Sequence, residues 1–511
     1  MTAMDQKRVL VAGAGPTGLV FALALTRLGI PVRIVDEAAE PGTTSRALAV
    51  QGRTLEFYRM LGIAERVMAD GTPVRGANLW VSGKRRAHLS LGDMGRGVSL
   101  FATPMIYPQD QHERMLIEEL GKRGVEVERP TELLGFEESG ECLRARLRRR
   151  DGSEEIFETP YIAGCDGAHS AVREQLQFGF PGGIYEHLFY VADIEATGDV
   201  LNGELHAALG EEDFLVVFPM KKAGTARLVG AVRSDAAATS EASDRKLGWE
   251  DVSKTVLGWL RIDVKKVNWF SSYRVHHRVA EHFRRGRAFL LGDAAHIHSP
   301  VGGQGMNTGI GDAMNLAWKM AGVLRRRVAP EILDTYEPER IAFARRLVAT
   351  TDRAFTAVTS SSTTAKFVRL DAVPVVLPIL ARFAYLRREA YLALSQAAIE
   401  YRESELSRGC AGEVQGGDRL PWFEGANGGE DNFAPLGEMD WQVQVYGQAA
   451  EGIRGLCGEH GVRLVEFAWS ERAEAAGFAR DAAYLVRPDG YVALANGGSA
   501  SLADYFARWM I

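Results

Sequence analysis

The chain has 511 residues, 46% of them hydrophobic, so it can bury a large core and should divide into two or three domains. Its net charge of −6 argues against a nucleic-acid partner. The four cysteines form neither a C-x-x-C pair nor a metal-binding spacing, which favours a reduced, cytoplasmic protein. Residues 373–381 are apolar but too short to span a bilayer and are interrupted by prolines, so we expect no stable membrane association.

A strand, a glycine-rich turn, a helix and a second strand open the chain. The apolar residues 9–12 are followed by GAGPTG, which has the G-x-G-x-x-G spacing. Residues 32–35 are followed by two acidic residues. The glycines allow a tight turn and a close approach to a pyrophosphate, and an acid at the second strand end suits a ribose hydroxyl. This order predicts dinucleotide binding. The candidate contacts are Gly13, Ala14, Gly15, Pro16, Thr17, Gly18, Asp36 and Glu37.

The middle of the chain alternates between strand and helix patterns. Residues 78–100 and 125–150 are strand-like, with a hairpin turn at Asp151-Gly152, and residues 111–121 form a helix. The turn CDGAHSAVR, residues 165–173, follows an apolar approach. Residues 178–273 mostly alternate between apolar and polar, apart from a helical stretch at 249–260. This pattern predicts a sheet-rich domain inserted into the first domain.

Residues 292–319, GDAAHIHSPVGGQGMNTGIGDAMNLAWK, are the most informative segment. An apolar run, residues 288–291, is followed by the carboxylate of Asp293, and a glycine-rich loop then leads into a helix. Such a loop directs backbone N–H groups and a helix N-terminus towards an electron-rich group, a phosphate or a flavin. His296 and His298 lie two residues apart on a turn without a third ligand, so we expect no metal. The candidate contacts are Gly292, Asp293, Pro300, Gly303, Gln304, Gly305, Met306 and Asn307.

The remaining chain predicts helices over about residues 334–408, then a linker, because glycine and acid are frequent beyond Gly409. The last hundred residues show alternating strands and a hairpin, VRPDGYVAL, with Pro488, Asp489 and Gly490 at its turn.

Together, the three motifs resemble those of the class A flavoprotein aromatic hydroxylases, the para-hydroxybenzoate and phenol hydroxylase family. Residues 45–58 (SRALAVQGRTLEFY), 108–113 (PQDQHE) and 336–340 (YEPER) extend the resemblance to roughly residues 7–405. The tail looks like the thioredoxin-like domain of the phenol and polyketide hydroxylase branch, but it lacks a redox cysteine pair, so packing or dimer formation is its expected role.

The resemblance implies an α/β protein with three domains. A discontinuous Rossmann-like FAD domain would comprise residues 1–77, 101–178 and 286–408. A β-sheet substrate domain would comprise 78–100 and 179–285, and a thioredoxin-like domain would comprise 409–511. A monomer or a homodimer is expected.

The resemblance also implies the cofactor and the reaction. Non-covalent FAD would contact Arg46 and Gln109, Asp166 would lie near the pyrophosphate or the nicotinamide path, and Pro300 and Gly303 would line the flavin face. NADPH or NADH would reduce the flavin, dioxygen would form a flavin hydroperoxide, and its distal oxygen would attack an electron-rich ring. The flavin then carries the chemistry, and we expect no nucleophile among the side chains.

The substrate is the least determined part. A phenol or polycyclic phenol suits the branch, and the candidate pocket walls, which are equally compatible with core packing, are Phe214, Val216, Phe218 and Tyr273. A Baeyer–Villiger or epoxidising enzyme would share every motif, and a catalytically idle flavin-binding protein is a further alternative. A flavin-dependent halogenase is disfavoured because its W-x-W-x-I-P signature is absent.

Overall fold

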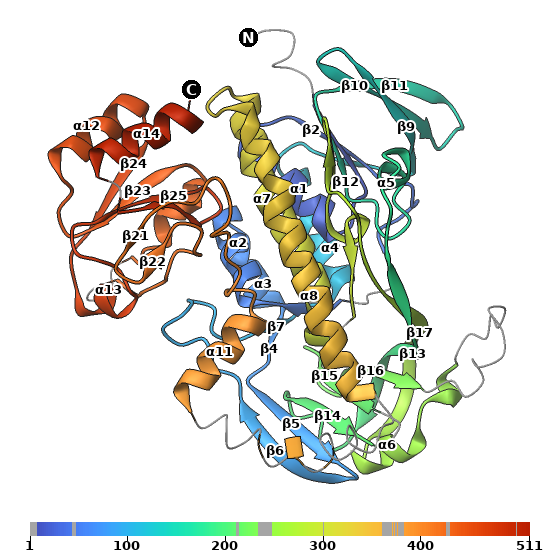
Figure 1. Ribbon diagram of the computed structural model, residues 1–511. Helices are drawn as coiled ribbons and strands as arrows, with labels where there is room; N and C mark the ends of the chain where they lie inside the picture. Colours follow the sequence, from blue (N-terminus) through green and yellow to red (C-terminus); the bar gives the residue numbers. More distant parts are fainter. Residues whose placement is uncertain are drawn as a thin grey trace.

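The structure is a computed structural model that describes residues 8–42, 47–210, 214–232, 248–299, 301–359, 370, 372–373, 376, 383–425, 430–496 and 498–510. Figure 1 shows a central sheet flanked by the long helices α7 (Gly305–Leu324) and α8 (Tyr336–Thr359), a large sheet at the bottom, and a C-terminal unit on the left. The mixed α/β, three-part fold class predicted from the sequence is confirmed.

The central six-stranded sheet carries the opening strand–helix–strand unit. All of its strands except β18 run parallel. The first two strands occupy the predicted residues and are buried throughout, as parallel strands covered on both faces are. Later segments supply the neighbouring strands, so the domain is discontinuous. In spatial order the strands are β18 (Arg284–Arg285), β19 (Ala288–Leu290), β12 (Ile162–Gly164), β1 (Val9–Ala12), β2 (Val32–Val35) and β8 (Val127–Glu128).

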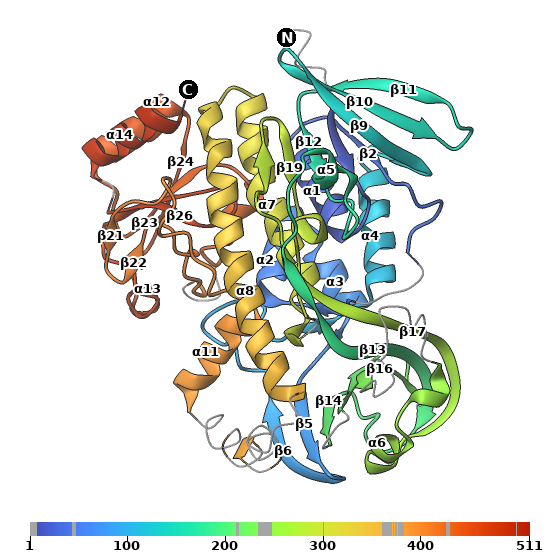
Figure 2. The same cartoon turned by 45° about the vertical axis from the view of Figure 1, so that its right-hand side comes forward.

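Helices complete this domain. The first helix starts with Pro16 at its first turn, ends before Gly29 (φ +67°), and packs against the fourth and seventh helices. Figure 2 shows these helices together in the centre of the molecule. The bounds are α1 (Pro16–Arg27), α2 (Gly52–Leu61), α3 (Ala64–Asp70), α4 (Gln109–Gly121) and α5 (Ala171–Gln175).

Two small sheets belong to the same part of the chain. The predicted turn at Asp151-Gly152 joins two antiparallel strands, and the Ser153 N–H donates to the Asp151 carboxylate. The three-stranded sheets are β9 (Thr131–Ser139), β10 (Cys142–Arg149) and β11 (Glu154–Thr159), and β3 (Ala49–Val50), β7 (Met105–Ile106) and β4 (Thr72–Pro73).

The large eight-stranded sheet draws on distant segments. Strand β5 pairs in parallel with β14, and β13 lies between β16 and β17. Alternate residues of β15 enter a core beneath α6 (Lys254–Trp259), as the alternating sequence predicts. In spatial order the strands are β20 (His296–Ile297), β17 (Asp263–Val279), β13 (Gly182–Thr197), β16 (Thr225–Val232), β15 (Phe214–Pro219), β14 (Leu205–Leu209), β5 (Gly76–Val81) and β6 (Lys84–Ser90).

The segment that follows α8 is less helical than expected. The described residues there include α11 (Ala384–Leu394), but residues 395–408 form turns and loops. The prediction of helix up to residue 408 was therefore wrong. Serine side chains hold this segment in another conformation: Ser404 donates to Glu339 in α8, and Ser407 donates to the Tyr401 carbonyl.

The expected linker after Gly409 was also wrong for residues 410–419. These residues form a hairpin of β21 (Cys410–Ala411) and β22 (Val414–Gln415). Gly416 and Gly417 are buried, and a Cβ on either would lie within 2.4 Å of the backbone of Arg408 or Arg402. The glycines here serve close packing and not flexibility.

The C-terminal unit has a thioredoxin-like four-stranded sheet. One pair of strands is parallel and the other pairs are antiparallel. None of the four cysteines, all of which lie within the described residues, forms a disulfide. None of the helices in the described ranges is long and apolar enough to cross a membrane. The elements are β24 (Arg463–Phe467), β23 (Gln442–Tyr446), β25 (Ala483–Val486), β26 (Val492–Ala495), η8 (Ala434–Glu438), α12 (Glu451–His460), α13 (Glu471–Ala475) and α14 (Ser499–Trp509).

Candidate functional site

The three predicted motifs meet at the carboxyl end of the central sheet. Gly13 has φ +98°, and a Cβ there would lie 2.2 Å from the Cys165 carbonyl oxygen. Thr17 packs against the third motif, because a Cβ on Gly292 or Gly309 would lie within 2.6 Å of its hydroxyl. The glycines thus allow three distant segments to pack closely together.

Gly15 differs from its neighbours. It is extended, it precedes α1 without a side-chain cap, and no atom of the described residues lies within 4 Å of the position its Cβ would take. The N-terminus of α1 therefore faces open space. This is the arrangement that a pyrophosphate needs for a close approach to backbone N–H groups.

Asp36 lies at the end of β2, beside this opening. Its carboxylate accepts the Ala14 N–H at 2.6 Å and the Ala38 N–H at 2.9 Å. Arg129, which the sequence analysis did not anticipate, pairs with Asp36 at 2.7 Å and donates to the Ala14 carbonyl. Glu37 is exposed. The second strand end thus fixes the glycine-rich turn through a carboxylate and a guanidinium.

A buried carboxylate supports the second motif. Asp312 in α7 accepts the Gly292 N–H at 3.0 Å, His296 Nε2 at 2.7 Å and Arg340 Nε at 2.6 Å. Burial alone would raise the pKa of Asp312, but Arg340 and His296 outweigh it and hold the pKa below its ordinary value. Asp293, beside this anchored glycine, is exposed. The Asp312 network therefore holds the backbone next to Asp293 in a fixed position.

Helix α7 begins at Gly305, without a side-chain cap. Asn307 cannot serve as a free ligand group, because its amide accepts from Gln51 N–H and Thr54 Oγ1 and donates to the carbonyls of Ala49 and Gly303. Its side chain fixes the loop around the helix start. Backbone groups are what this helix end offers to a ligand.

The neighbouring predicted side chains that the structure describes, Gln304 and Met306, both have partners within the protein. The Gln304 amide donates to the Leu394 carbonyl and accepts from Gln396, so its side chain also has a structural role. Met306 is half-buried and packs at the edge of the main core. Arg46 and Pro300 lie outside the described residues.

Gln109 begins α4, and Asp166 lies in the turn that precedes α5. Gln109 donates to Glu113 at 2.8 Å. Asp166 accepts from Ser170 at 2.6 Å and from the Val172 N–H at 3.1 Å. Burial raises the pKa of Asp166, and these bonds only partly offset it. Its side chain holds the CDG turn against α5.

The candidate substrate residues line one face of the large sheet. Phe214, Val216 and Phe218 alternate on β15 with the buried Leu215 and Val217. Their face is therefore opposite the α6 core.

This face leads towards the glycine-rich loop. Phe189 joins Phe214 and Tyr273, with ring centroids 5.9 Å apart in each pair. Phe218 packs in a cluster with Ala49, and a Cβ on Gly303 would lie 2.8 Å from the Ala49 methyl carbon. The aromatic face and the start of α7 are thus neighbours.

Two buried polar atoms at this end of the sheet have no hydrogen-bond partner among the described residues: His298 Nε2 and Ser299 Oγ. His298 Nε2 lies 3.8 Å from the position of a Cβ on Gly305, beside the uncapped helix. Burial lowers the pKa of His298 to about 4, so its imidazole is neutral at physiological pH. Orphaned polar atoms beside an open glycine cradle fit a bound polar cofactor such as FAD.

The same geometry bears on metal binding. Within the described ranges no group of three His, Cys, Asp or Glu residues is arranged to hold a metal ion. His296 bonds to Asp312, and His298 Nδ1 lies 2.8 Å from the Ser299 carbonyl oxygen.

Comparison with known proteins connects this site to a family. The family model described as FAD binding domain matches residues 6–351. A 6-methylpretetramide 4-monooxygenase of Streptomyces rimosus is 35% identical over 410 residues, 79% of this chain and 72% of the relative. A dialkyldecalin synthase of Streptomyces rugosporus is 30% identical over 98% of both chains. The solved structure of the OxyS anhydrotetracycline hydroxylase from Streptomyces rimosus superposes with a TM-score of 0.79 at 25% identity, covering 98% of this chain and 99% of that one.

Proposed function

The chain belongs to the FAD-binding family of class A flavoprotein aromatic hydroxylases, and on this premise we propose that it hydroxylates a phenolic or polycyclic aromatic substrate with FAD, NAD(P)H and dioxygen. The observation that carries the proposal is the open position at Gly15, facing an uncapped α1, at the point where the Asp293 turn and the start of α7 also meet. The relatives named as monooxygenases and hydroxylases support the reaction class.

Each part of the site suits one part of FAD. The pyrophosphate would lie on the Gly13–Gly18 turn at the α1 N-terminus, and Asp36 would face a ribose hydroxyl. Asp293 would accept from the ribityl chain, and the backbone of residues 303–307 would face the pyrimidine edge of the ring. Arg46, Gln109, Asp166 and Pro300 are proposed contacts on the family resemblance. When bound, FAD would supply the redox chemistry with dioxygen, and the side chains would orient it and exclude water.

The aromatic face of the large sheet is the proposed substrate wall. Phe214 and Phe218 are only partly buried, and the sheet face they share approaches the loop that would hold the flavin. Flat aromatic side chains suit an aromatic ligand, because ring pairs add to the apolar area buried.

Sheet membership supports the proposed domain limits, apart from the first two residues of β5 and the short strand β20, which pair in the eight-stranded sheet. We assign residues 1–77, 101–178 and 286–408 to FAD binding, 78–100 and 179–285 to the substrate sheet, and 409–511 to the thioredoxin-like domain. The entry of β5 and β6 into the eight-stranded sheet supports the split. The free cysteines favour a reducing, cytoplasmic location, and we expect a monomer or homodimer.

The decisive experiment follows NAD(P)H consumption across a panel of phenols and polycyclic phenols under labelled dioxygen. We expect slow consumption without substrate and a rise of at least about tenfold with a suitable one, about 1.4 kcal/mol of barrier. One labelled oxygen on an aromatic carbon is the expected product. Absence of both stimulation and labelled product would contradict a monooxygenase.

Two other reactions have distinct signatures in the same experiment. A labelled oxygen inserted between a ring carbon and a carbonyl would identify a Baeyer–Villiger enzyme. The likeness to the dialkyldecalin synthase favours a cyclisation as the second candidate. Such a reaction would give a product of unchanged mass without labelled oxygen and without NAD(P)H consumption.

A further inference from the structure

The turn between β25 and β26 packs against the FAD domain, and its charged side chains are buried there. Arg487 and Asp489 are at most 1% exposed. Arg487 donates to both carboxylate oxygens of Glu339 in α8, at 2.9 and 3.0 Å, and to Asp489 at 2.7 and 3.0 Å. Lys319 in α7 donates to the same Glu339 at 2.8 Å. This C-terminal turn, residues 487–491, thus meets two helices of the flavin site.

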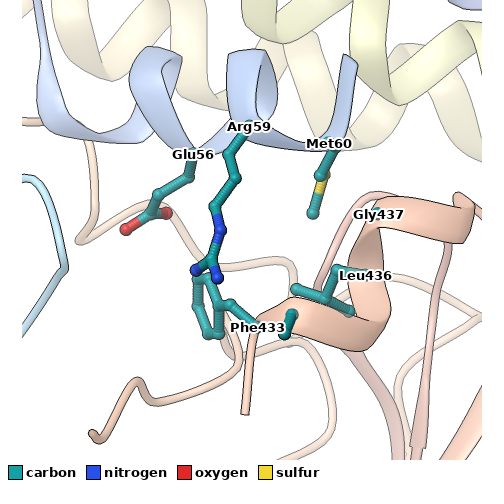
Figure 3. Close-up of a pocket in the computed structure, with 7 residues that line it drawn as sticks. Glu56, Arg59, Met60, Phe433, Leu436 and Gly437 are labelled. Atoms are coloured by element: carbon teal, nitrogen blue, oxygen red, sulfur yellow. The ribbon is translucent and has the colours of Figure 1, made fainter. Parts of the chain in front are cut away.

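The turn also contacts α2. Arg53 donates to the Asp489 carbonyl at 2.7 Å and to Glu56 at 2.8 Å, and Arg419 pairs with Glu56 on its other side. Figure 3 shows Arg59 of α2 extending towards Phe433 across the small pocket between α2 and η8, with Glu56 beside it on the same helix.

At its N-terminal end, α2 lies against the proposed flavin loop. The N–H of Gln51, just before the helix, and the hydroxyl of Thr54 both donate to Asn307 in the first turn of α7. One helix therefore connects the C-terminal turn to the start of α7.

A second route runs through α8. Arg340, next to Glu339, donates to Asp312 at 2.6 Å, to the Thr308 carbonyl at 3.1 Å and to the Tyr401 hydroxyl at 2.8 Å. The Tyr401 ring lies against Tyr491 of the C-terminal turn, with centroids 4.4 Å apart. Asp312 in turn holds the Gly292 N–H. The turn is thus three side chains away from the base of the Asp293 loop.

Such a network is costly to build. Buried ion pairs lose hydration that their attraction barely repays, so they contribute little net stability, and removing one partner is strongly unfavourable. One documented use of buried polar networks is to fix a single geometry, because a fully satisfied network restricts the arrangement of its members. Here the geometry that is fixed is that of the loops at the carboxyl end of the central sheet.

We propose that the thioredoxin-like domain is a positioning element of the flavin site: its buried turn holds α2 and α8, and these hold Asn307 and the Asp312–Arg340 pair beneath the FAD-binding loops. The proposal rests on the proposed function, in that the ligand is FAD. Tyr401 is then a positioning residue, although it lies outside the cofactor cradle.

The test compares two buried tyrosines. Tyr401→Phe removes one acceptor of Arg340, whereas Tyr484→Phe removes a hydroxyl whose partners among the described residues, the Ala411 carbonyl and the Ala479 N–H, both lie in the C-terminal domain. Titration of the purified apoprotein with FAD should show a dissociation constant raised at least about fivefold in Tyr401→Phe and nearly unchanged in Tyr484→Phe. The visible circular dichroism of bound FAD should change only in Tyr401→Phe. Equal losses of affinity in both variants would overturn the proposal.

A second measurement needs no variant. Because coupling between sites is reciprocal, FAD binding should slow hydrogen exchange at residues 487–491 of the wild-type chain as well as at the glycine-rich loops. Protection confined to the loops would overturn the positioning role and leave the proposed function intact. Failure of the wild-type chain to bind FAD would instead refute the proposed function, and the inference with it.

Discussion

Gly13 and Gly15 are two residues apart, but the backbone conformation and packing require a glycine only at position 13. Gly13 needs its positive φ and has no room for a Cβ, whereas Gly15 has an ordinary extended conformation and open space beside it. A glycine that the fold does not require is explained if a ligand takes the space. The contrast separates the folding role of the motif from its binding role.

Gly15→Ala should therefore leave the apoprotein intact and weaken FAD binding. We expect an unfolding free energy within about 0.5 kcal/mol of wild type, because the methyl group meets nothing. The FAD dissociation constant should rise at least about tenfold, the equivalent of about 1.4 kcal/mol, measured by flavin fluorescence. Gly92→Ala, also in open space, is the matched control. Normal FAD affinity in Gly15→Ala would place the pyrophosphate elsewhere.

Asp293→Ala tests the second motif. The loss of one charged acceptor for the ribityl chain should cost about 1 to 3 kcal/mol of FAD binding, while the exposed position leaves the fold unchanged. FAD content after purification and the melting temperature of the apoprotein measure the two effects. Asp263→Ala, at an exposed carboxylate on β17, should alter neither. Full FAD occupancy with normal turnover would show that Asp293 is misassigned.

At the scale of elements, the opening strand–helix–strand unit was predictable because short-range patterns determine it. The apolar runs, Pro16 and Gly29 mark its limits within the local sequence. The Asp312–Arg340 and Glu339–Arg487 pairs were not predictable, since their partners are 28 and 148 residues apart. Their charged side chains resemble ordinary surface residues until the fold buries them.

Composition also misled in a specific way. Glycines at 416 and 417 resemble those of a flexible linker, but backbone packing against residues 402 and 408 requires them. Among the site residues, those that offer backbone groups could be located from glycine spacing. The side chains that hold these loops, such as Arg129 and Asp312, could not, because nothing local distinguishes them.

Glu339 joins α7, α8 and the C-terminal turn, and its substitution should be costly. Burial would raise the pKa of Glu339, but Arg487 and Lys319 outweigh it and hold the pKa far below its ordinary value. Glu339→Gln leaves Lys319 without its carboxylate partner and Arg487 with Asp489 alone, and it should lower the unfolding free energy by about 3 to 5 kcal/mol at pH 7 in urea titrations. Glu405→Gln, in an exposed pair with Arg508, should cost less than about 1 kcal/mol.

The pH dependence of the unfolding free energy should differ between wild type and Glu339→Gln. A carboxylate with a depressed folded-state pKa contributes stability that is complete above the unfolded value of 4.5 and is lost as pH falls below it. Wild type should therefore lose up to about 1.4 kcal/mol per pH unit more than Glu339→Gln below pH 4.5. Parallel profiles would show that Glu339 is not ionised in the folded state.

For the whole molecule, the interface between the FAD and thioredoxin-like domains resembles the interior of a single domain. Charged residues on both sides are fully buried and satisfy one another across it. Linkers between independent domains are usually exposed and crossed by few contacts. Here the two domains should behave as one cooperative unit.

Native-state hydrogen exchange can measure this cooperativity. The slowest amides of β1, in the central sheet, and of β23, in the C-terminal sheet, should open with free energies equal within about 1 kcal/mol. Amides of the exposed strand β6 provide a low-stability reference. A markedly lower value for β23 would mean that the C-terminal domain unfolds separately.

The position of Arg487 in the chain has a consequence for biosynthesis. Glu339 and Lys319 emerge from the ribosome well before Arg487, which follows Glu339 by 148 residues. During translation the nascent FAD domain therefore carries a carboxylate at a site that is buried in the native fold, and its bidentate partner is not yet synthesised. A premature stop codon anywhere between residues 339 and 487 would leave Glu339 with Lys319 but without its bidentate partner in every molecule produced. Such truncated chains should be targets for chaperones and proteases, even though their entire nucleotide-binding sequence is present.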